Sequence, residues 1–459
     1  MPADLSFTTA LLAAALRNAP RRYRMPPLPV DAAAARAAGA ETAIAFALEA
    51  RRESAASDCA PADGLRDLFT TALHTLIREA LAPEGGEPDF QAQVLRAQDD
   101  TVDAYVRLAA QAAHDARSVR AAVNAIAHPG KLRHMPPGAT REWLANLHTL
   151  TAAQAWGDLR AALTQALAAD RVVDPALIEA LGQLLTHPAL ARLEQRTALH
   201  AHDGVRRHHA LLARRGPLAA SDAAAAQGKA SARAGAEAEA GAVEAFSRIA
   251  AALNRAAPSA PPYRAVHGLR NPPTLPAGDK TKGEWDALLV RGSPADAAEL
   301  VLLAEVKASP TAAAPDLPRL LRGLAAVAAA DAHTPYAFRS SRGEVRIRGD
   351  SLRRLRPNGR ALPPHAIYCC AAVEAAVPML GTASKAVLMT EPASLAFGVR
   401  LMRGESPSSE ALAPVWQALH TPRLRTALHQ YATACAVRDA MLHPDDLLLA
   451  VEQALARRA

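Results

Sequence analysis

The residues best suited to chemistry are two carboxylates and a lysine in the stretch WDALLVRGSPADAAELVLLAEVK. This stretch reads as a hairpin, with strands at Trp285–Arg291 and Leu300–Ala308 joined by a Gly-Ser-Pro-Ala-Asp turn. Because side chains alternate between the two faces of a strand, Asp286, Glu305 and Lys307 each share a face with apolar residues. Three charged side chains are therefore expected on faces apolar enough to be buried.

A buried charge is costly unless it is paired or bound to a metal ion. Two carboxylates are hard oxygen ligands of the kind that Mg²⁺ prefers, and the ion keeps waters and substrate phosphate in its other positions. A bound ion polarises the phosphate and lowers the pKa of its water. A lysine beside the second carboxylate would orient that water or stabilise charge on phosphorus. The three residues thus indicate metal-assisted phosphodiester cleavage.

Asp286, followed on the next strand by Glu305-Val306-Lys307, resembles the active-site signature of the PD-(D/E)xK nuclease superfamily, which has the restriction-endonuclease-like fold. One departure is that Trp285, and not proline, precedes the aspartate. The resemblance covers roughly residues 233–400. It implies an α-β-β-β-α-β core, Asp286 and Glu305 as ligands of Mg²⁺ or Mn²⁺, and Lys307 as the catalytic lysine.

A glutamate on the helix before the motif often points at the metal in this family. The segment GAEAEAGAVEAFSRIAAAL offers three candidates. Glu239 lies four residues before Val243 and seven before Phe246, so helical periodicity places it on the apolar stripe. We therefore expect Glu239 to complete the metal site.

Lysine is scarce in this chain, and three of its six lysines, Lys280, Lys282 and Lys307, lie within 28 residues. Arginine does not replace lysine where a compact ammonium must sit near a metal-bound water, so this clustering favours a functional site. The alternative is an exposed hairpin edge on which Glu305 and Lys307 form a solvated ion pair.

A second feature is the arginine-rich segment 338–360, which carries a net charge of +6. With Ser340, Ser341 and Gly343 at a turn, it is consistent with a hairpin arm laid along a phosphate backbone. The alternative is a solvated loop in an arginine-biased chain. The residues expected to contact nucleic acid are Lys280, Lys282, Arg319, Arg322, Arg339, Arg342, Arg346 and Arg348.

The elements that must position these residues divide the chain into regions that differ in composition and in hydrophobic periodicity. Residues 1–215 predict successive helices, 216–232 a linker, 233–403 the nuclease-like α/β domain, and 404–459 a helical C-terminal cap. The expected fold is multidomain, with an all-α N-terminal region and a restriction-endonuclease-like domain built on a mixed central sheet. Its strands are expected at Tyr263–Leu269, in the hairpin, and at Glu344–Arg348, Ala366–Val373, Lys385–Thr390 and Leu395–Met402, with an amphipathic helix at Asp316–Ala330.

Composition limits the setting of this chemistry. The chain has 459 residues, a formal net charge of +7 and four cysteines without CxxC spacing, which predicts a reduced, cytoplasmic protein without a disulfide framework. No apolar run is long enough to predict a membrane span.

The sequence therefore predicts a Mg²⁺-dependent endonuclease acting on DNA, whose helical N-terminal region recognises a target, a protein partner or a second copy. Two alternatives stay open. One is a catalytically inactive nuclease-fold module that binds nucleic acid or serves in assembly, and the other is a helical protein-interaction protein.

Overall fold

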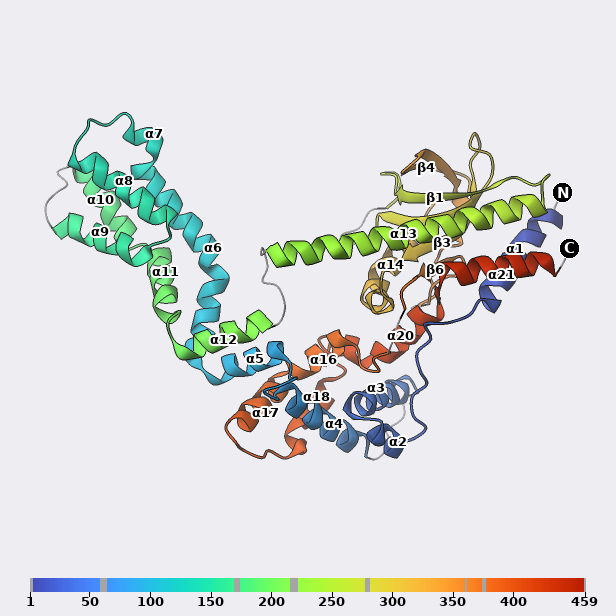
Figure 1. The fold of residues 1–459 in the computed structure, drawn as a ribbon, viewed down its shortest axis with the longest axis horizontal. Coiled ribbons are helices and arrows are strands. Elements are labelled where there is room, and N and C mark those ends of the chain that lie inside the picture. The colour runs from blue at the N-terminus through green and yellow to red at the C-terminus, as the bar shows by residue number, and fades with distance from the viewer. Residues whose placement is uncertain are drawn as a thin grey trace. The chain divides into compact units, whose positions relative to one another are not determined.

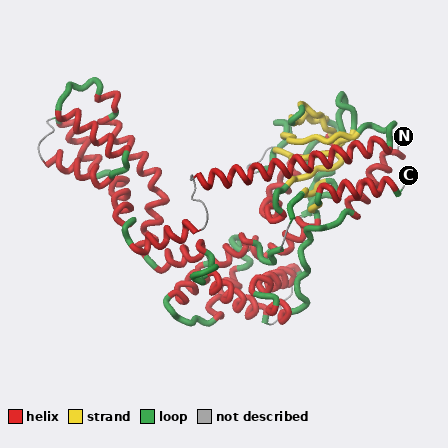
Figure 2. Tube along the Cα trace, in the orientation of Figure 1, coloured by secondary structure: helices red, strands yellow, loops and turns green. Residues whose placement is uncertain are grey.

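A computed structural model describes residues 3–57, 64–168, 174–214, 222–276, 281–359, 361–373 and 377–457. The chain forms two compact units. The first comprises residues 1–76, 219–388 and 409–459, and the second comprises residues 77–218 and 389–408. Each unit is described separately below, and Figures 1 and 2 show the elements of both. No helix of the described ranges is long and apolar enough to cross a membrane.

The first unit is built on a mixed sheet of seven strands in the order β5-β4-β1-β2-β3-β6-β7. The strands β1, β2 and β3 form an antiparallel meander, β6 runs parallel to β3, and β7 runs parallel to β6. Their bounds are β1 Tyr263–Arg270, β2 Glu284–Arg291, β3 Glu299–Val306, β4 Pro335–Ser340, β5 Gly343–Arg348, β6 Ala366–Cys369 and β7 Met441–Leu442.

Helices cover both faces of this sheet. On one face α13, α1 and α21 bury an apolar layer that includes Phe246, Leu289 and Val451. On the other face α14 packs Leu317, Leu320 and other residues of its apolar stripe against β2 and β3. The helices of this unit are α1 Ala3–Asn18, α2 Ala32–Ala37, α3 Ala40–Ala56, most of α4 Leu65–Ala80, α13 Asp222–Ala256, α14 Ala313–Val327, α15 Gly349–Arg353, α16 Thr382–Met389, α18 Ala413–Ala418, α19 Arg425–Leu428, α20 Gln430–Asp439 and α21 Pro444–Ala456.

The central strand β3 is buried along its whole length. Because helices cover both of its faces, its sequence ELVLLAEV is almost continuously apolar and does not alternate. Its two charged residues, Glu299 and Glu305, therefore need buried partners. The neighbouring hairpin β4–β5 is different: β5 alternates exposed and buried residues, and its turn is closed by Gly343 at φ +112°.

The described residues of the second unit form helices joined by loops, without a strand. The helices α6, α8, α9, α10 and α11 surround an apolar core that includes Val119, Leu163 and Leu190. The helices of this unit are α5 Pro88–Gln98, α6 Asp100–Ala127, α7 Pro129–Leu132, α8 Ala139–Ala152, α9 Trp156–Ala168, α10 Pro175–Leu185, α11 Pro188–Leu199, α12 Asp203–Arg214 and α17 Pro392–Met402.

Two expected strands are helices, and the expected domain borders differ from the compact units. The run Lys385–Thr390 lies mainly in α16, and Leu395–Met402 lies in α17, which begins with a proline in its first turn. Short apolar runs do not distinguish a strand from a buried helix, which is why both were misassigned. The described part of the expected 216–232 linker belongs to α13, and the first 76 residues belong to the sheet-containing unit.

Candidate functional site

The candidate site lies where β2 and β3 run side by side, on the face of the sheet that α14 covers. Asp286 lies on β2, Glu305 lies near the end of β3, and Lys307 follows that strand. A carboxylate oxygen of Asp286 accepts a hydrogen bond of 2.7 Å from the backbone N–H of Val306. The fold therefore ties the aspartate directly to the segment that carries the glutamate and the lysine.

The charged side chains form a continuous network of ion pairs. Lys307 Nζ lies 2.9 Å from Glu305 Oε1 and 2.9 Å from Asp316 Oδ2, on α14. Lys282 Nζ pairs with Glu305 Oε2 and lies 3.5 Å from Asp286 Oδ1. The Glu305 side chain is 2% exposed and the other four are between 9% and 17% exposed. The network is thus largely withdrawn from water, and salt screens such buried charges only weakly.

Burial sets the protonation behaviour of the centre of this network. Burial raises the pKa of Glu305, the neighbouring Asp286 raises it further, and the two ammonium groups only partly oppose this. For Lys307, burial lowers the pKa, but Glu305 and Asp316 outweigh that effect and raise it above the ordinary value. Lys307 therefore carries its proton at neutral pH and acts as a cation, not as a base.

The fit of this site to a metal ion depends on its oxygen atoms. Among the described residues, no group of three or more histidine, cysteine, aspartate or glutamate side chains is arranged to hold a metal ion. Mg²⁺ commonly uses only one or two carboxylates together with water and phosphate. Glu305 Oε2 and Asp316 Oδ2 are buried and have a lysine ammonium within ion-pair distance, yet accept no well-directed hydrogen bond. Asp286 and Glu305 are consequently suitable ligands if Lys282 gives way.

Lys282 is held in place by its backbone surroundings. The Nδ2 of Asn271 lies 3.4 Å from the Lys282 carbonyl oxygen, and Asn271 Oδ1 accepts a 2.7 Å hydrogen bond from the Trp285 indole. Gly323 of α14 packs so closely that a Cβ there would lie 2.9 Å from the Cβ of Lys282. The backbone and the Cβ of Lys282 are therefore fixed by Asn271 and α14, and the ammonium at the end of the side chain is held by its carboxylate partners.

Lys282 and Asp316 are the members of the network that the sequence analysis did not assign to it. Lys282 is expected from the sequence to contact nucleic acid; its side chain is only 9% exposed and is engaged by two carboxylates, and the contact with nucleic acid stays a prediction without a structural observation that supports it. The scarcity of lysine pointed to this residue. Asp316 precedes the apolar stripe of α14, and no signal in the sequence distinguished it from an N-terminal helix carboxylate.

Glu239 is exposed on α13, so the expectation that it lies on the buried stripe was wrong. The buried stripe runs through Ala242, Phe246 and Ile249, and α13 covers the face of the sheet opposite to α14. In this turn of α13 the residue that packs toward the sheet is Ala238, one position before Glu239. As a metal ligand Glu239 stays a prediction, without a contact in the described structure that supports it.

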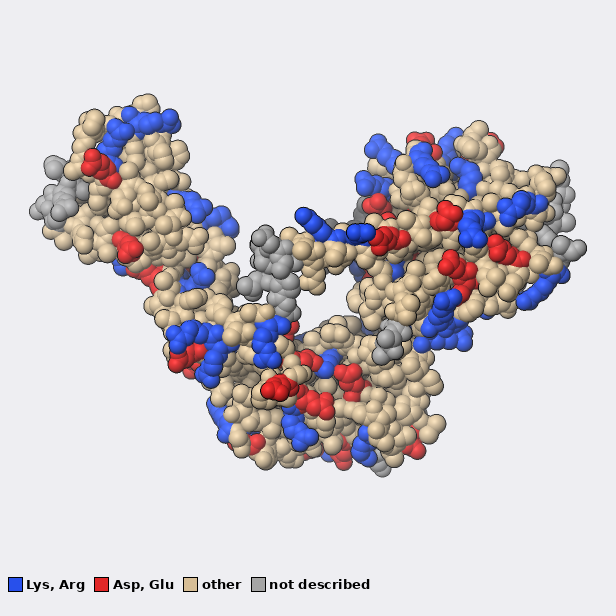
Figure 3. Space-filling view, in the orientation of Figure 1, with Lys and Arg blue, Asp and Glu red and all other residues tan. Residues whose placement is uncertain are grey.

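The arginines expected to contact nucleic acid are exposed. Arg339, Arg342, Arg346 and Arg348 lie on the β4–β5 hairpin and its turn, which the sequence analysis expected as a hairpin arm. Figure 3 shows basic side chains over the region labelled β4 and β1 in Figure 1. Arg319 and Arg322 are exposed on α14, and Lys280 lies outside the described residues.

No family model, curated protein or solved structure matches this chain. Its function is therefore inferred from the geometry and chemistry of its own residues.

Proposed function

We propose that this chain is a metal-dependent nuclease that hydrolyses phosphodiester bonds in DNA. The observation that carries the proposal is the buried cluster of Asp286, Glu305 and Lys307. The order α13-β1-β2-β3-α14-β6 also agrees with the α-β-β-β-α-β order that the resemblance to PD-(D/E)xK nucleases implies. In this proposal Asp286 and Glu305 hold Mg²⁺ or Mn²⁺.

A bound divalent ion would supply Lewis-acid polarisation of the phosphate and a more acidic water. The side chains of the cluster would do the remaining work. Asp286, held by the Val306 N–H, keeps one carboxylate in a fixed position. Lys307 is anchored by Glu305 and Asp316, and its raised pKa keeps it protonated. It would therefore donate hydrogen bonds to the attacking water or to a phosphate oxygen and stabilise the charge that develops there.

The β4–β5 hairpin supplies the complementary surface for a polyanion. Arg346 and Arg348 alternate with the buried Val345 and Ile347, so both arginines lie on the outer face of β5. On β4, Arg339 is also exposed. Three arginines on one exposed ribbon, of which Arg348 also pairs with Asp350 at 3.2 Å, supply positive charge along its length, so we propose that this face contacts DNA.

A second function is favoured by a specific contact. Lys282 pairs with Glu305 and approaches Asp286, so an internal ammonium already occupies the space between the two proposed ligands and offsets part of their charge. A module in which this pairing is permanent would bind nucleic acid through the hairpin without cleaving it.

Incubation of the full chain with supercoiled plasmid and Mg²⁺ or Mn²⁺ tests the two functions. The nuclease proposal expects nicking that chelation abolishes and that Glu305→Gln and Lys307→Met reduce by about 10²-fold or more, as for loss of a group that stabilises transition-state charge. A matched control is Glu299→Gln, because Glu299 is also buried on β3 and paired, with Arg291 and Arg354. Cleavage by Glu305→Gln at the native rate would refute the nuclease. DNA binding without cleavage under either ion would support the binding module.

A further inference from the structure

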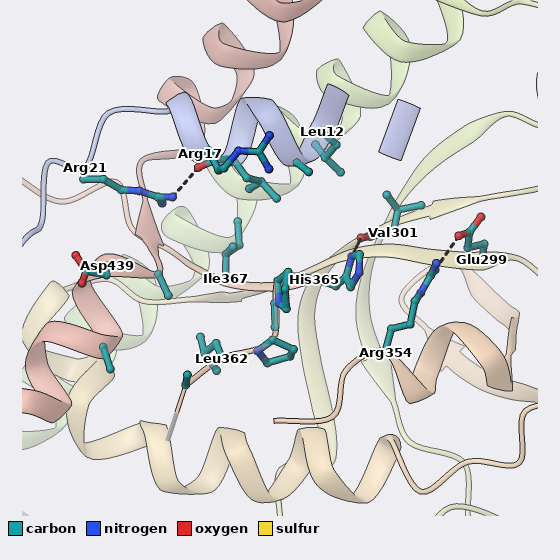
Figure 4. Close-up of a pocket in the computed structure, with 18 residues that line it drawn as sticks. Leu12, Arg17, Arg21, Glu299, Val301, Arg354, Leu362, His365, Ile367 and Asp439 are labelled. Carbon is teal, nitrogen blue, oxygen red and sulfur yellow. Dashed lines mark hydrogen bonds and ion pairs between the residues drawn. The ribbon is translucent and has the colours of Figure 1, made fainter. Parts of the chain in front are cut away.

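A cavity of about 590 Å³ lies at the opposite end of β3 from Glu305. Glu299 and Val301 line it from the first half of β3, and Ala366 and Ile367 line it from the start of the parallel strand β6. The end of α1, the segment before β6 and the end of α20 complete the wall, as Figure 4 shows. The cavity is thus formed within the sheet-containing unit and is separate from the candidate nuclease site.

The wall of this cavity is mainly aliphatic. Leu12, Leu16, Val301, Leu362 and Ile367 contribute most of its larger apolar side chains, and its described lining residues include no phenylalanine, tyrosine or tryptophan. A nucleobase is commonly held by stacking on aromatic rings, and the one aromatic ring among the described lining residues is the imidazole of His365, whose Nδ1 is engaged by the Val301 carbonyl oxygen. A volume of this size is typical of sites for small organic ligands. The wall therefore suits an aliphatic body.

Two guanidinium groups at one side of the cavity form no ion pair with a carboxylate of the described residues. Arg17 and Arg21 lie on the same side, and Arg21 donates a 2.5 Å hydrogen bond to a backbone carbonyl oxygen at the end of α1 (Figure 4). Within the described part of the chain, neither guanidinium lies within ion-pair distance of a carboxylate.

The two lining carboxylates already have other partners. Glu299 pairs with Arg291 and Arg354, and Asp439 pairs with Arg24 at 3.3 Å. Asp439 therefore acts on Arg21 only at longer range, and both guanidinium groups can accept an anion from outside the chain as an ion-pair partner.

The remaining titratable group at the cavity is His365. Its Nδ1–H donates to the carbonyl oxygen of Val301 at 3.2 Å, and burial, with Arg354 nearby, lowers its pKa. His365 thus adds no charge at neutral pH, and the positive potential comes from the arginine side alone.

We propose that this cavity binds an organic anion with an aliphatic body, whose carboxylate or phosphate head pairs with Arg17 and Arg21 while its chain lies against Val301 and Ile367. Both parts of the cavity contribute to selectivity. The guanidinium groups select an anion, and the aliphatic wall selects a ligand with a hydrocarbon chain over a bare inorganic ion. The proposal does not depend on the nuclease function, because no residue of the Glu305 cluster lines the cavity.

Isothermal titration of the full chain with octanoate and with octyl phosphate tests the proposal, and the two arms distinguish a carboxylate head from a phosphate head. We expect one molecule of the preferred anion to bind per chain. Uncharged octanol and cationic octylammonium should bind at least about tenfold more weakly, the effect of losing one charge-assisted hydrogen bond. Inorganic phosphate alone should not bind, because it lacks the aliphatic body.

Variants locate the bound anion. Arg17→Gln and Arg21→Gln should each weaken binding about tenfold, and both are expected to fold because neither arginine has a carboxylate partner to lose. Arg248→Gln on the exposed face of α13 is the matched control and should bind as the native chain does. Ala13→Phe should exclude all the probes by filling the cavity. Equal binding of octanol and octanoate, unchanged affinity in the Arg17→Gln/Arg21→Gln chain, or no binding of either anion at millimolar concentration would each overturn the proposal.

Discussion

The ammonium of Lys282 contacts both carboxylates that we propose as metal ligands, so its removal should strengthen the binding of a divalent cation. Lys282→Met keeps the length and the apolar stem of the side chain and removes its charge. The stem packs against Gly323, which leaves little space for rearrangement of the backbone. The substitution therefore isolates the competition between an internal ammonium and an external ion.

The magnitude follows from the contact geometry. At the 3.5 Å between Lys282 Nζ and Asp286 Oδ1, two unit charges attract by about 5 kcal/mol at an effective dielectric constant of about 20. The ammonium regains hydration when it is displaced, which offsets much of that loss. A net cost of about 1.5–3 kcal/mol remains, so Lys282→Met should bind Mn²⁺ roughly 10- to 100-fold more tightly than the native chain.

The assay is titration with Mn²⁺ followed by electron paramagnetic resonance of the free ion, which requires no cleavage activity. Lys385→Met is the matched control, because Lys385 also forms a lysine–glutamate pair, with Glu41 at 3.1 Å. The gain should disappear in Lys282→Met/Glu305→Gln. Equal affinity of the Lys282→Met and native chains, or a gain that survives the loss of Glu305, would refute the reasoning.

Three further predictions concern the same unit. Because the pKa of Glu305 is raised on folding, its contribution to stability is full below the ordinary value of 4.5 and is lost as pH rises through the raised value. Urea unfolding across that range should show a fall in the free energy of unfolding that Glu305→Gln lacks. The affinity for Mn²⁺ should rise with pH over the same range. Gly323→Ala should lower the free energy of unfolding by about 1–3 kcal/mol through overlap with Lys282, whereas Gly235→Ala in open space on α13 should not lower it. Arg346→Gln should reduce the slope of log K against log salt for DNA binding by about 0.9, measured by fluorescence anisotropy.

The parts of the fold that the sequence predicted are those with a strong local pattern. The hairpin of β2 and β3 has two apolar runs around a Gly-Ser-Pro turn, and α14 has an apolar stripe at helical spacing. The strand at Tyr263–Leu269 and the arginine-bearing hairpin turn were likewise found where expected. In these segments the apolar positions of the sequence are the positions that the fold buries, and for that reason periodicity alone located them.

The parts that could not be predicted depend on contacts between distant segments. The pairing of Lys282 with Glu305 joins residues 23 positions apart and exists only once β2 and β3 are aligned. Asp316 reaches Lys307 only because α14 folds back over the sheet. The angle of α13 about its own axis, which leaves Glu239 exposed, is set by its packing on β1 and α21 and not by its own alanine-rich sequence.

The charge of the buried cluster separates the two proposed functions. Asp286, Glu305 and Asp316 present three carboxylates to two ammonium groups, so the cluster carries one surplus negative charge when all five are ionised. The raised pKa of Glu305 is one response to this surplus, because a proton on Glu305 removes the unpaired buried charge. If a divalent ion takes the place of the Lys282 ammonium, three negative charges face one ammonium and two ionic charges, and the cluster becomes neutral. The network can therefore reach neutrality through a proton on Glu305 or through exchange of Lys282 for a divalent cation, and only the nuclease proposal requires the exchange.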